Sequence, residues 1–83
     1  MGEWMKQQMK ASKFTYDKLC ATSGLARGSL IRWANGDRVP KLSTFLILCE
    51  VFAKSQNKGF TEMIVSGLQE MPEYQFAMRR GHK

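Results

Sequence analysis

This 83-residue chain contains only one histidine and two cysteines, and it lacks the sequence motifs that are typical of catalytic sites. The single histidine, His82, is the penultimate residue, where a catalytic base would lack a supporting scaffold. The sequence also contains no carboxylate pair, glycine-rich phosphate loop or nucleophile motif. We therefore expect a protein that is not an enzyme and that uses no cofactor and no small-molecule substrate.

The two cysteines, Cys20 and Cys49, are not accompanied by a C-x-x-C pair or a Cys/His cluster. Without such a set of ligands, no metal site is expected. A free cysteine packs like a small apolar side chain, which is the interpretation we favour for both residues. A disulfide between them is the alternative, and an intracellular setting argues against it.

Long apolar runs are missing as well, since none approaches the ~18 residues that a membrane span requires. The longest apolar-rich segment, residues 42–53, is interrupted by Ser43, Thr44 and Glu50. The first ten residues, MGEWMKQQMK, lack the apolar block of a signal peptide. These features predict a cytoplasmic protein with no membrane partner.

Negative charge is in the minority, because 13 Lys and Arg face 7 Asp and Glu, giving a net charge of +6. The excess lies in residues 1–58, which hold ten basic and four acidic residues, whereas residues 59–83 hold three of each. A basic surface attracts phosphates without regard to base sequence. A solubilising surface is the alternative, so charge alone does not decide the function.

The apolar content, 43% of the residues, is enough for one small core. Helical spacing of the apolar residues predicts an all-α fold, a compact bundle of about five short helices. We expect residues 1–70 to form one domain. Residues 71–83 would be a C-terminal extension that is either flexible or part of a dimer contact.

The most informative segment is residues 15–40, TYDKLCATSGLARGSLIRWANGDRVP, which predicts two short helices joined by a tight turn. Thr15 is a suitable N-cap for the first helix, and Asp17 is favourable in its first turn. Gly24 suits the left-handed position that ends this helix. The segment therefore predicts a helix-turn-helix at the centre of the bundle.

The second helix of this segment, predicted over 27–35, has one apolar side when each residue advances the helix by about 100°. Its buried residues would be Leu30, Trp33 and Ala34. Its outward residues would be Gly28, Ile31, Arg32 and Asn35, with Ser29 at the flank and Arg27 at the N-terminal end. Gly36 then ends the helix.

The order of these residues resembles the Cro and lambda-repressor-like family, also called Xre-type regulators, whose pattern runs T-x-x-x-L-A-x-x-x-G-V-S-x-x-x-I-x-R-W-E-x-G-x-x-x-P. The matching residues or close equivalents are Thr15, Leu19, Gly24, Leu25, Leu30, Arg32, Trp33, Gly36 and Pro40. A fourth helix of the family is matched by Leu42, Thr44, Phe45, Leu46, Leu48, Cys49 and Phe52. The resemblance implies a lambda-repressor-like fold and binding to double-stranded DNA.

Three departures from the family pattern concern its capping, its core and its DNA backbone contacts. Met9 and Ala34 replace a frequent Arg–Glu pair, a change that is often neutral or stabilising because no charge is desolvated. Ala26 replaces the usual Ser or Thr cap, which should cost about 1 kcal/mol of helix stability. Tyr16 replaces a Gln that touches the DNA backbone, and tyrosine can still donate to a phosphate oxygen.

The resemblance places the second helix in the major groove with its N-terminal half at the base edges. The predicted base-contacting residues are Arg27, Gly28, Ser29, Ile31 and Arg32. The two arginines are the best readers because a guanidinium matches O6 and N7 of guanine. Gly28 has no side chain, so specificity should rest on fewer contacts or on close approach of the helix. For Arg32, a solvated helix face is the alternative.

Phosphate contacts are expected around the same helix. The predicted residues are Thr15, Tyr16, Asn35, Arg38, Lys41 and Thr44. Two of them have a purely structural alternative: Thr15 as a helix cap, and Asn35, with Gly36, as a helix stop.

Two more helices are predicted on either side of this region. Residues 3–10 would bury Met5 and Met9, with Trp4 covering an edge, and residues 60/61–69 would present an apolar stripe. Part of the stripe would complete the core, and the exposed remainder is a candidate homodimer interface. The dimer candidates are Phe60, Met63, Ile64, Leu68, Met71 and Phe76. A monomer is the alternative.

These observations favour a sequence-specific double-stranded DNA-binding transcriptional regulator, a repressor of phage or bacterial type by family analogy. Such a protein would be associated with the nucleoid through its DNA. The alternative from another class is a protein-interaction module of the same fold, such as an antitoxin-like partner. Salt separates the two, since phosphate-driven binding weakens steeply as salt rises.

Overall fold

Five helices account for most of residues 2–70, the part of the chain that this computed structural model describes. They are α1 (Gly2–Ser12), α2 (Tyr16–Ser23), α3 (Arg27–Ala34), α4 (Leu42–Gln56) and α5 (Phe60–Glu70). The described range contains no strand, so the predicted all-α class and five-helix bundle are confirmed. Residues 71–83, the predicted C-terminal extension, lie outside the described residues.

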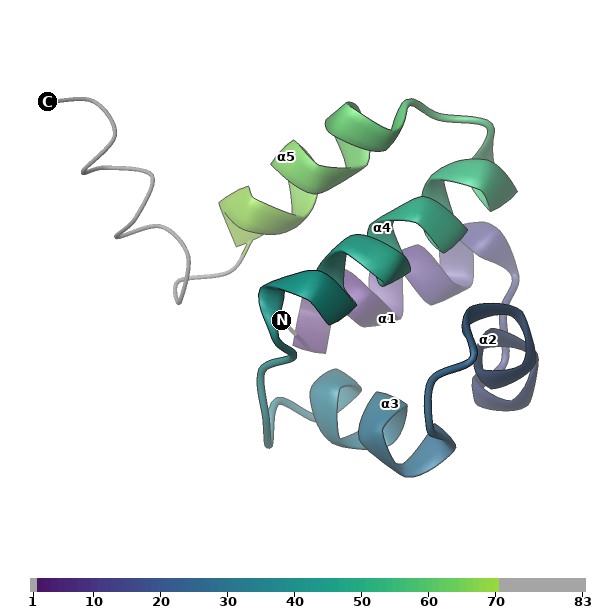
Figure 1. Cartoon of the computed structure of the whole chain (residues 1–83), viewed down its shortest axis with the longest axis vertical. Coiled ribbons are helices and arrows are strands. Elements are labelled where there is room, and N and C mark those ends of the chain that lie inside the picture. Colours follow the sequence, from purple (N-terminus) through teal and green to yellow (C-terminus); the bar gives the residue numbers. More distant parts are fainter. Residues whose placement is uncertain (1, 71–83) are drawn as a thin grey trace, which may run out of the picture.

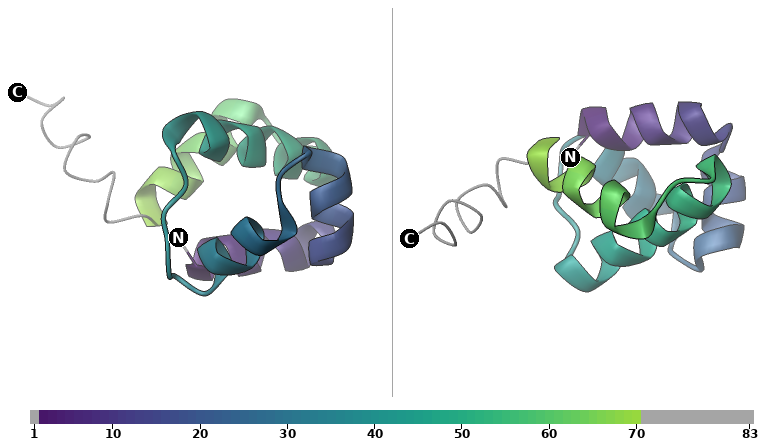
Figure 2. Two further views of the ribbon diagram at one scale, coloured as in Figure 1. Left: turned by 60° about the horizontal axis from the view of Figure 1, so that its bottom comes forward. Right: turned by 90° about the horizontal axis from the view of Figure 1, so that it is seen from above.

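Helix α4 lies at the centre of the bundle, where it contacts α1, α2 and α5. Helix α3 contacts α1 and α2. In Figure 1, α3 and α5 lie on opposite sides of the α1–α4 pair. The view from above in Figure 2 shows α5 in front, between α1 on one side and α4 on the other. Helix α3 therefore forms one outer edge of the molecule, and α5 closes the core on the other side.

Trp4 of α1 is the largest fully buried side chain of the core, with 1% of its surface exposed. Its ring centroid lies 5.4 Å from that of Phe45 and 5.7 Å from that of Phe52, both on α4. Its indole N–H donates to Ser66 Oγ of α5 at 3.4 Å. The expectation that Trp4 covers an edge is wrong, because α5 folds over the indole and encloses it.

The apolar residues that replace the family's ion pair are both in the core. Met9 is 8% exposed and Ala34 is 1% exposed, and no charged side chain belongs to the buried core cluster of the described residues. Met5 is also buried, as predicted. An apolar core of this kind holds α3 against α1 without any desolvated charge.

The polar stretch of residues 55–59, SQNKG, predicts a turn, but helix α4 continues through the first two of these residues and ends at Gln56. Gln56 is still helical, and its amide donates to Gln8 Oε1 at 2.8 Å and to Ser12 Oγ at 3.0 Å. Asn57 then ends the helix in the left-handed conformation, with φ of 56°. The two hydrogen bonds to α1 stabilise the last turn of α4, which local sequence signals do not reveal.

Helix α5 approaches the core closely at Gly67. A Cβ atom added there would lie 2.5 Å from two ring carbons of Phe45 and 3.1 Å from the Trp4 ring. Both rings are fully buried and cannot move away without disturbing their other contacts. A side chain at this position would therefore force α5 away from α1 and α4.

Gly67→Ala should lower the free energy of unfolding by about 1 to 3 kcal/mol because of this overpacking. The matched control is Gly28→Ala in α3, where an added Cβ meets nothing within 4 Å. At that site alanine should raise stability by up to about 1 kcal/mol through its better helix propensity. Urea denaturation followed by circular dichroism measures both, and equal effects of the two substitutions would contradict the close approach.

Candidate nucleic-acid interface

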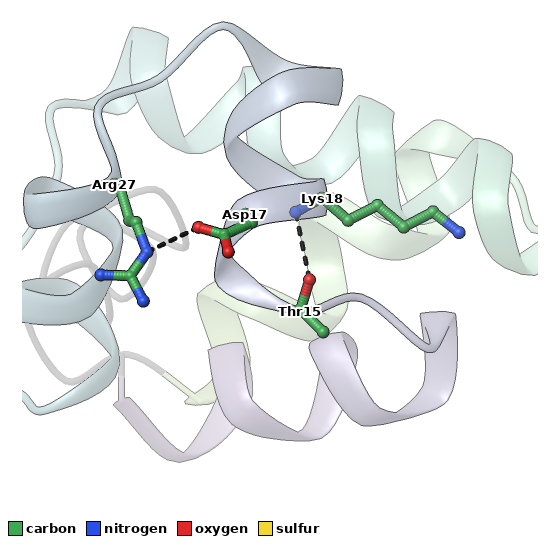
Figure 3. A network of polar contacts seen from close by, with 4 residues as sticks. All are labelled: Thr15, Asp17, Lys18 and Arg27. Atoms are coloured by element: carbon green, nitrogen blue, oxygen red, sulfur yellow. Dashed lines mark hydrogen bonds and ion pairs between the residues drawn. The ribbon is translucent and has the colours of Figure 1, made fainter.

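Helix α2 begins and ends where the sequence predicts. Thr15 is its N-cap, and the Thr15 hydroxyl accepts a hydrogen bond from the backbone N–H of Lys18 at 3.1 Å (Figure 3). Gly24 has φ of 76°, and its N–H donates to the carbonyl of Cys20 at 2.9 Å. This left-handed residue ends α2 and allows the chain to enter α3 only three residues later, at Arg27.

Helix α3 is held from behind by Leu30 and Ala34, which are 0% and 1% exposed. The start of α1 is close to the end of α3, since a Cβ added at Gly2 would lie 2.6 Å from the carbonyl oxygen of Ala34. Trp33 packs against the core as predicted, but it is only partly buried. The Trp33 side chain borders a hollow in the surface.

The outward face of α3 agrees with the helical phase read from the sequence. Arg27, Gly28 and Arg32 are exposed, and Asn35 is exposed just after the helix. Ser29 and Ile31 are half-buried, which leaves Ile31 less prominent than a fully outward position would make it. The exposed surface of α3 is therefore formed by its two arginines on either side of a bare glycine.

A shallow hollow of about 340 Å³ lies beside the second half of α3. It is lined by Ser29, Arg32, Trp33, Arg38, Val39, Pro40, Lys41 and Thr44, and we call it the basic hollow. These residues come from α3, from the α3–α4 connection and from the first turn of α4. Three of the lining side chains are cations, and no carboxylate belongs to this lining set of described residues.

Two helices of the candidate interface begin without a side-chain cap: α4 beside the basic hollow, and α3 at its end away from the hollow. Neither Ala26 before α3 nor Lys41 before α4 provides a capping hydrogen bond. The absence of a cap at Ala26 agrees with the departure noted in the sequence. The first N–H groups of a helix carry a partial positive charge and favour anions. At the start of α4, which borders the basic hollow, these N–H groups add to the positive charge of the hollow.

A second group of predicted site residues gathers at the other end of α3. Arg27 Nε donates to Asp17 Oδ1 at 2.7 Å, and the guanidinium lies 6.0 Å from the Tyr16 ring centroid (Figure 3). The sequence analysis did not predict the ion pair between Asp17 and Arg27. The available signal was an acidic residue in the first turn of α2 and an arginine at the first position of the next helix.

Eight of the eleven predicted DNA-contacting residues fall into two sets, and Gly28, Ile31 and Asn35 belong to neither. The basic hollow brings together Ser29, Arg32, Arg38, Lys41 and Thr44. The start of α2 and α3 brings together Tyr16 and Arg27, with Thr15 next to them in the chain. Asn35 ends α3, where its N–H donates to the carbonyl of Ile31 at 2.9 Å.

The predicted dimer residues are not all at the surface. Met63 is 2% exposed and belongs to the core, so its inclusion is corrected: the side chain is covered by the rest of the same chain. Ile64 and Leu68 are partly buried against the core, and Phe60 is 44% exposed. Met71 and Phe76 lie outside the described residues.

The two cysteines are free thiols in different surroundings: Cys49 is fully buried and Cys20 is half-buried. Burial raises the pKa of the Cys49 thiol to about 12, because the thiolate would lose its hydration. The thiolate is the reactive form, so Cys49 is an inert core residue.

Iodoacetamide at pH 8 should therefore modify Cys20 and spare Cys49 while the protein is folded. In denaturant both thiols should react, because unfolding returns Cys49 to water. Peptide mass spectrometry after timed quenching locates the modified residue. Rapid native alkylation of Cys49 would contradict its burial beneath the other helices.

No helix within residues 2–70 has both the length and the apolar character to cross a bilayer. The chain matches no protein-family model, no curated protein and no solved structure. The lambda-repressor-like resemblance therefore stays a prediction.

Proposed function

We propose that this protein is a sequence-specific double-stranded DNA-binding regulator of transcription, and that α2 and α3 act as a helix-turn-helix. The observation that carries the proposal is the basic hollow beside an outward, core-anchored α3. An exposed helix flanked by cations and uncapped helix starts is suited to a polyanion with a groove. This function needs no catalytic residue, cofactor or metal, and it belongs in the cytoplasm with the nucleoid.

In the proposed complex, α3 lies in the major groove. Arg32 points away from Leu30 and Ala34 and reads guanine through its guanidinium. Gly28 lets the backbone of α3 approach the bases, because no side chain separates them. Ser29 and Ile31 are at the flanks of the helix and are limited to short-range contacts.

Phosphates are bound on both sides of α3 in this proposal. Arg38, Lys41 and Thr44 hold one strand where the uncapped start of α4 adds its N–H groups. Tyr16 and Thr15 lie at the start of α2, and the Thr15 hydroxyl, which accepts from Lys18, can still donate to a phosphate oxygen. Asn35 contributes from the end of α3.

A homodimer is part of the proposal. Half-sites one helical turn apart would separate two α3 helices by about 34 Å. The apolar contact would come from Phe60 and from the accessible edges of Ile64 and Leu68.

A protein-interaction module is the second candidate, and two exposed apolar side chains favour it. Val39 is 39% exposed and borders the basic hollow, and Leu42, at the start of α4, is 55% exposed. Apolar residues of this size beside a charged surface are common at protein interfaces. The same surface cannot serve a protein partner and a DNA duplex at once, so a binding measurement distinguishes the two.

Titration of a fluorescent random duplex at low salt should give a complex whose affinity falls steeply as salt is added. The logarithm of the association constant should decline linearly with the logarithm of salt concentration, by about 0.9 for each phosphate contacted. Fluorescence anisotropy measures this slope. Absence of any complex at low salt would refute the DNA-binding proposal and favour the protein-interaction module.

Arg32→Ala should reduce discrimination between a duplex selected from a random pool and a scrambled duplex by about 1 to 3 kcal/mol, because a bidentate base contact is lost. General affinity for DNA should remain. Competition binding at one fixed salt concentration measures the ratio.

Lys41→Ala is the matched control for this substitution, because it removes one cation from the same hollow. It should weaken binding to every duplex similarly and reduce the salt slope by about one unit, as loss of a phosphate contact requires. Discrimination unchanged by Arg32→Ala, or abolished by Lys41→Ala, would contradict the assigned roles.

A further inference from the structure

The contact between Asp17 and Arg27 joins two helices at the edge of the surface proposed to meet DNA. The residues are ten positions apart, and the 2.7 Å distance between Arg27 Nε and Asp17 Oδ1 spans the start of α2 and the start of α3. The ring of Tyr16 lies 6.0 Å from the guanidinium carbon. One arginine side chain is thus held by a carboxylate and flanked by an aromatic face.

Stability does not explain this arrangement. The side chains of Arg27 and Asp17 are 56% and 81% exposed, and an ion pair so accessible to water adds little to the free energy of folding. Electrostatic attraction to DNA does not explain it either, because a carboxylate beside the phosphates repels them and offsets the charge of Arg27. The remaining effect is on the orientation of the guanidinium.

Figure 3 shows Nε directed at Asp17 and the two terminal nitrogens turned away from the carboxylate. The free end of a guanidinium carries a pair of N–H donors suited to O6 and N7 of guanine. Arg27 held in this way has already lost side-chain freedom before it meets a base. Ordering a long side chain is otherwise a cost of binding.

We propose that Asp17 is a positioning residue that fixes Arg27 for bidentate recognition of one guanine, at the expense of general affinity for DNA. Tyr16 supports the same orientation through its ring face. This inference rests on the proposed DNA-binding function and deepens it, because it assigns a specificity role to a carboxylate that makes no direct contact with a base. It also distinguishes Arg27 from Arg32, which lies in a hollow with no carboxylate in its described lining.

Asp17→Asn tests the proposal because its two expected effects have opposite signs. Affinity for a scrambled duplex should rise, since a negative charge next to the phosphates is removed. Discrimination should fall by about twofold to tenfold at the base pair whose preference is lost in Arg27→Ala, since Arg27 is no longer held. Competition binding with duplexes that differ only at that pair measures both effects, and thermal denaturation verifies the fold.

Asp37→Asn is the matched control, because Asp37 is an exposed carboxylate just after α3 and its substitution changes the charge equally. It should raise affinity for scrambled DNA without altering discrimination at the same base pair. In the Arg27→Ala background, Asp17→Asn should have no further effect on discrimination. The positioning role of Asp17 is supported if Asp17→Asn and Asp37→Asn differ in their effect on discrimination and if this difference disappears in the Arg27→Ala background.

The failures of this inference and of the proposed function have different signatures. If the wild-type protein binds no duplex, the DNA-binding proposal fails and the positioning role fails with it. If the wild-type protein binds and discriminates, but Asp17→Asn and Asp37→Asn behave alike, the positioning role alone is overturned. It is overturned equally if Arg27→Ala retains every base preference.

Discussion

Burial of Leu30 and Ala34 is the constraint on which the exposed surface of α3 depends. The two residues are four positions apart, so they form one contact line along a helix of eight residues. Once that line faces the core, the helical period leaves Gly28 and Arg32 no orientation except outward. Proximity of Gly2 to the carbonyl of Ala34 fixes the end of the helix as well. The proposed reading surface is thus a consequence of apolar packing behind it.

Local rules predicted the ends of the helices in this region, because each depends on a few neighbouring residues. Thr15 caps α2 and Gly24 adopts the left-handed conformation for reasons contained in the segment itself. Trp4 and Met63 were misjudged because their burial depends on α5 crossing over α1 and α4. That crossing requires the close approach at Gly67, and no periodicity in a single helix indicates which other helix will cover it.

The candidate site likewise has a part that the sequence predicted and a part that it did not. The positions of Arg32 and Lys41 followed from helical phase and from the resemblance, and they share the basic hollow. The pairing of Asp17 with Arg27 depends on how closely the first turns of α2 and α3 approach one another. The number of residues between Asp17 and Arg27 does not indicate how far apart they lie in the fold. Each residue also has an ordinary local explanation: Asp17 as a carboxylate at the start of a helix, and Arg27 as a surface cation.

The cations of the basic hollow and Arg27 differ in their electrostatic surroundings. This difference affects how the protein would bind DNA in the proposed function. Arg38 and Lys41 line a hollow whose described members include no carboxylate. The charge of Arg27 is offset by Asp17 at 2.7 Å. Long-range attraction would then come mainly from the α3–α4 side, and Arg27 would contribute through the geometry of its donors. Arg38 and Lys41 would therefore supply mainly affinity, whereas Arg27, at the other end of α3, would add to the selectivity that Arg32 provides.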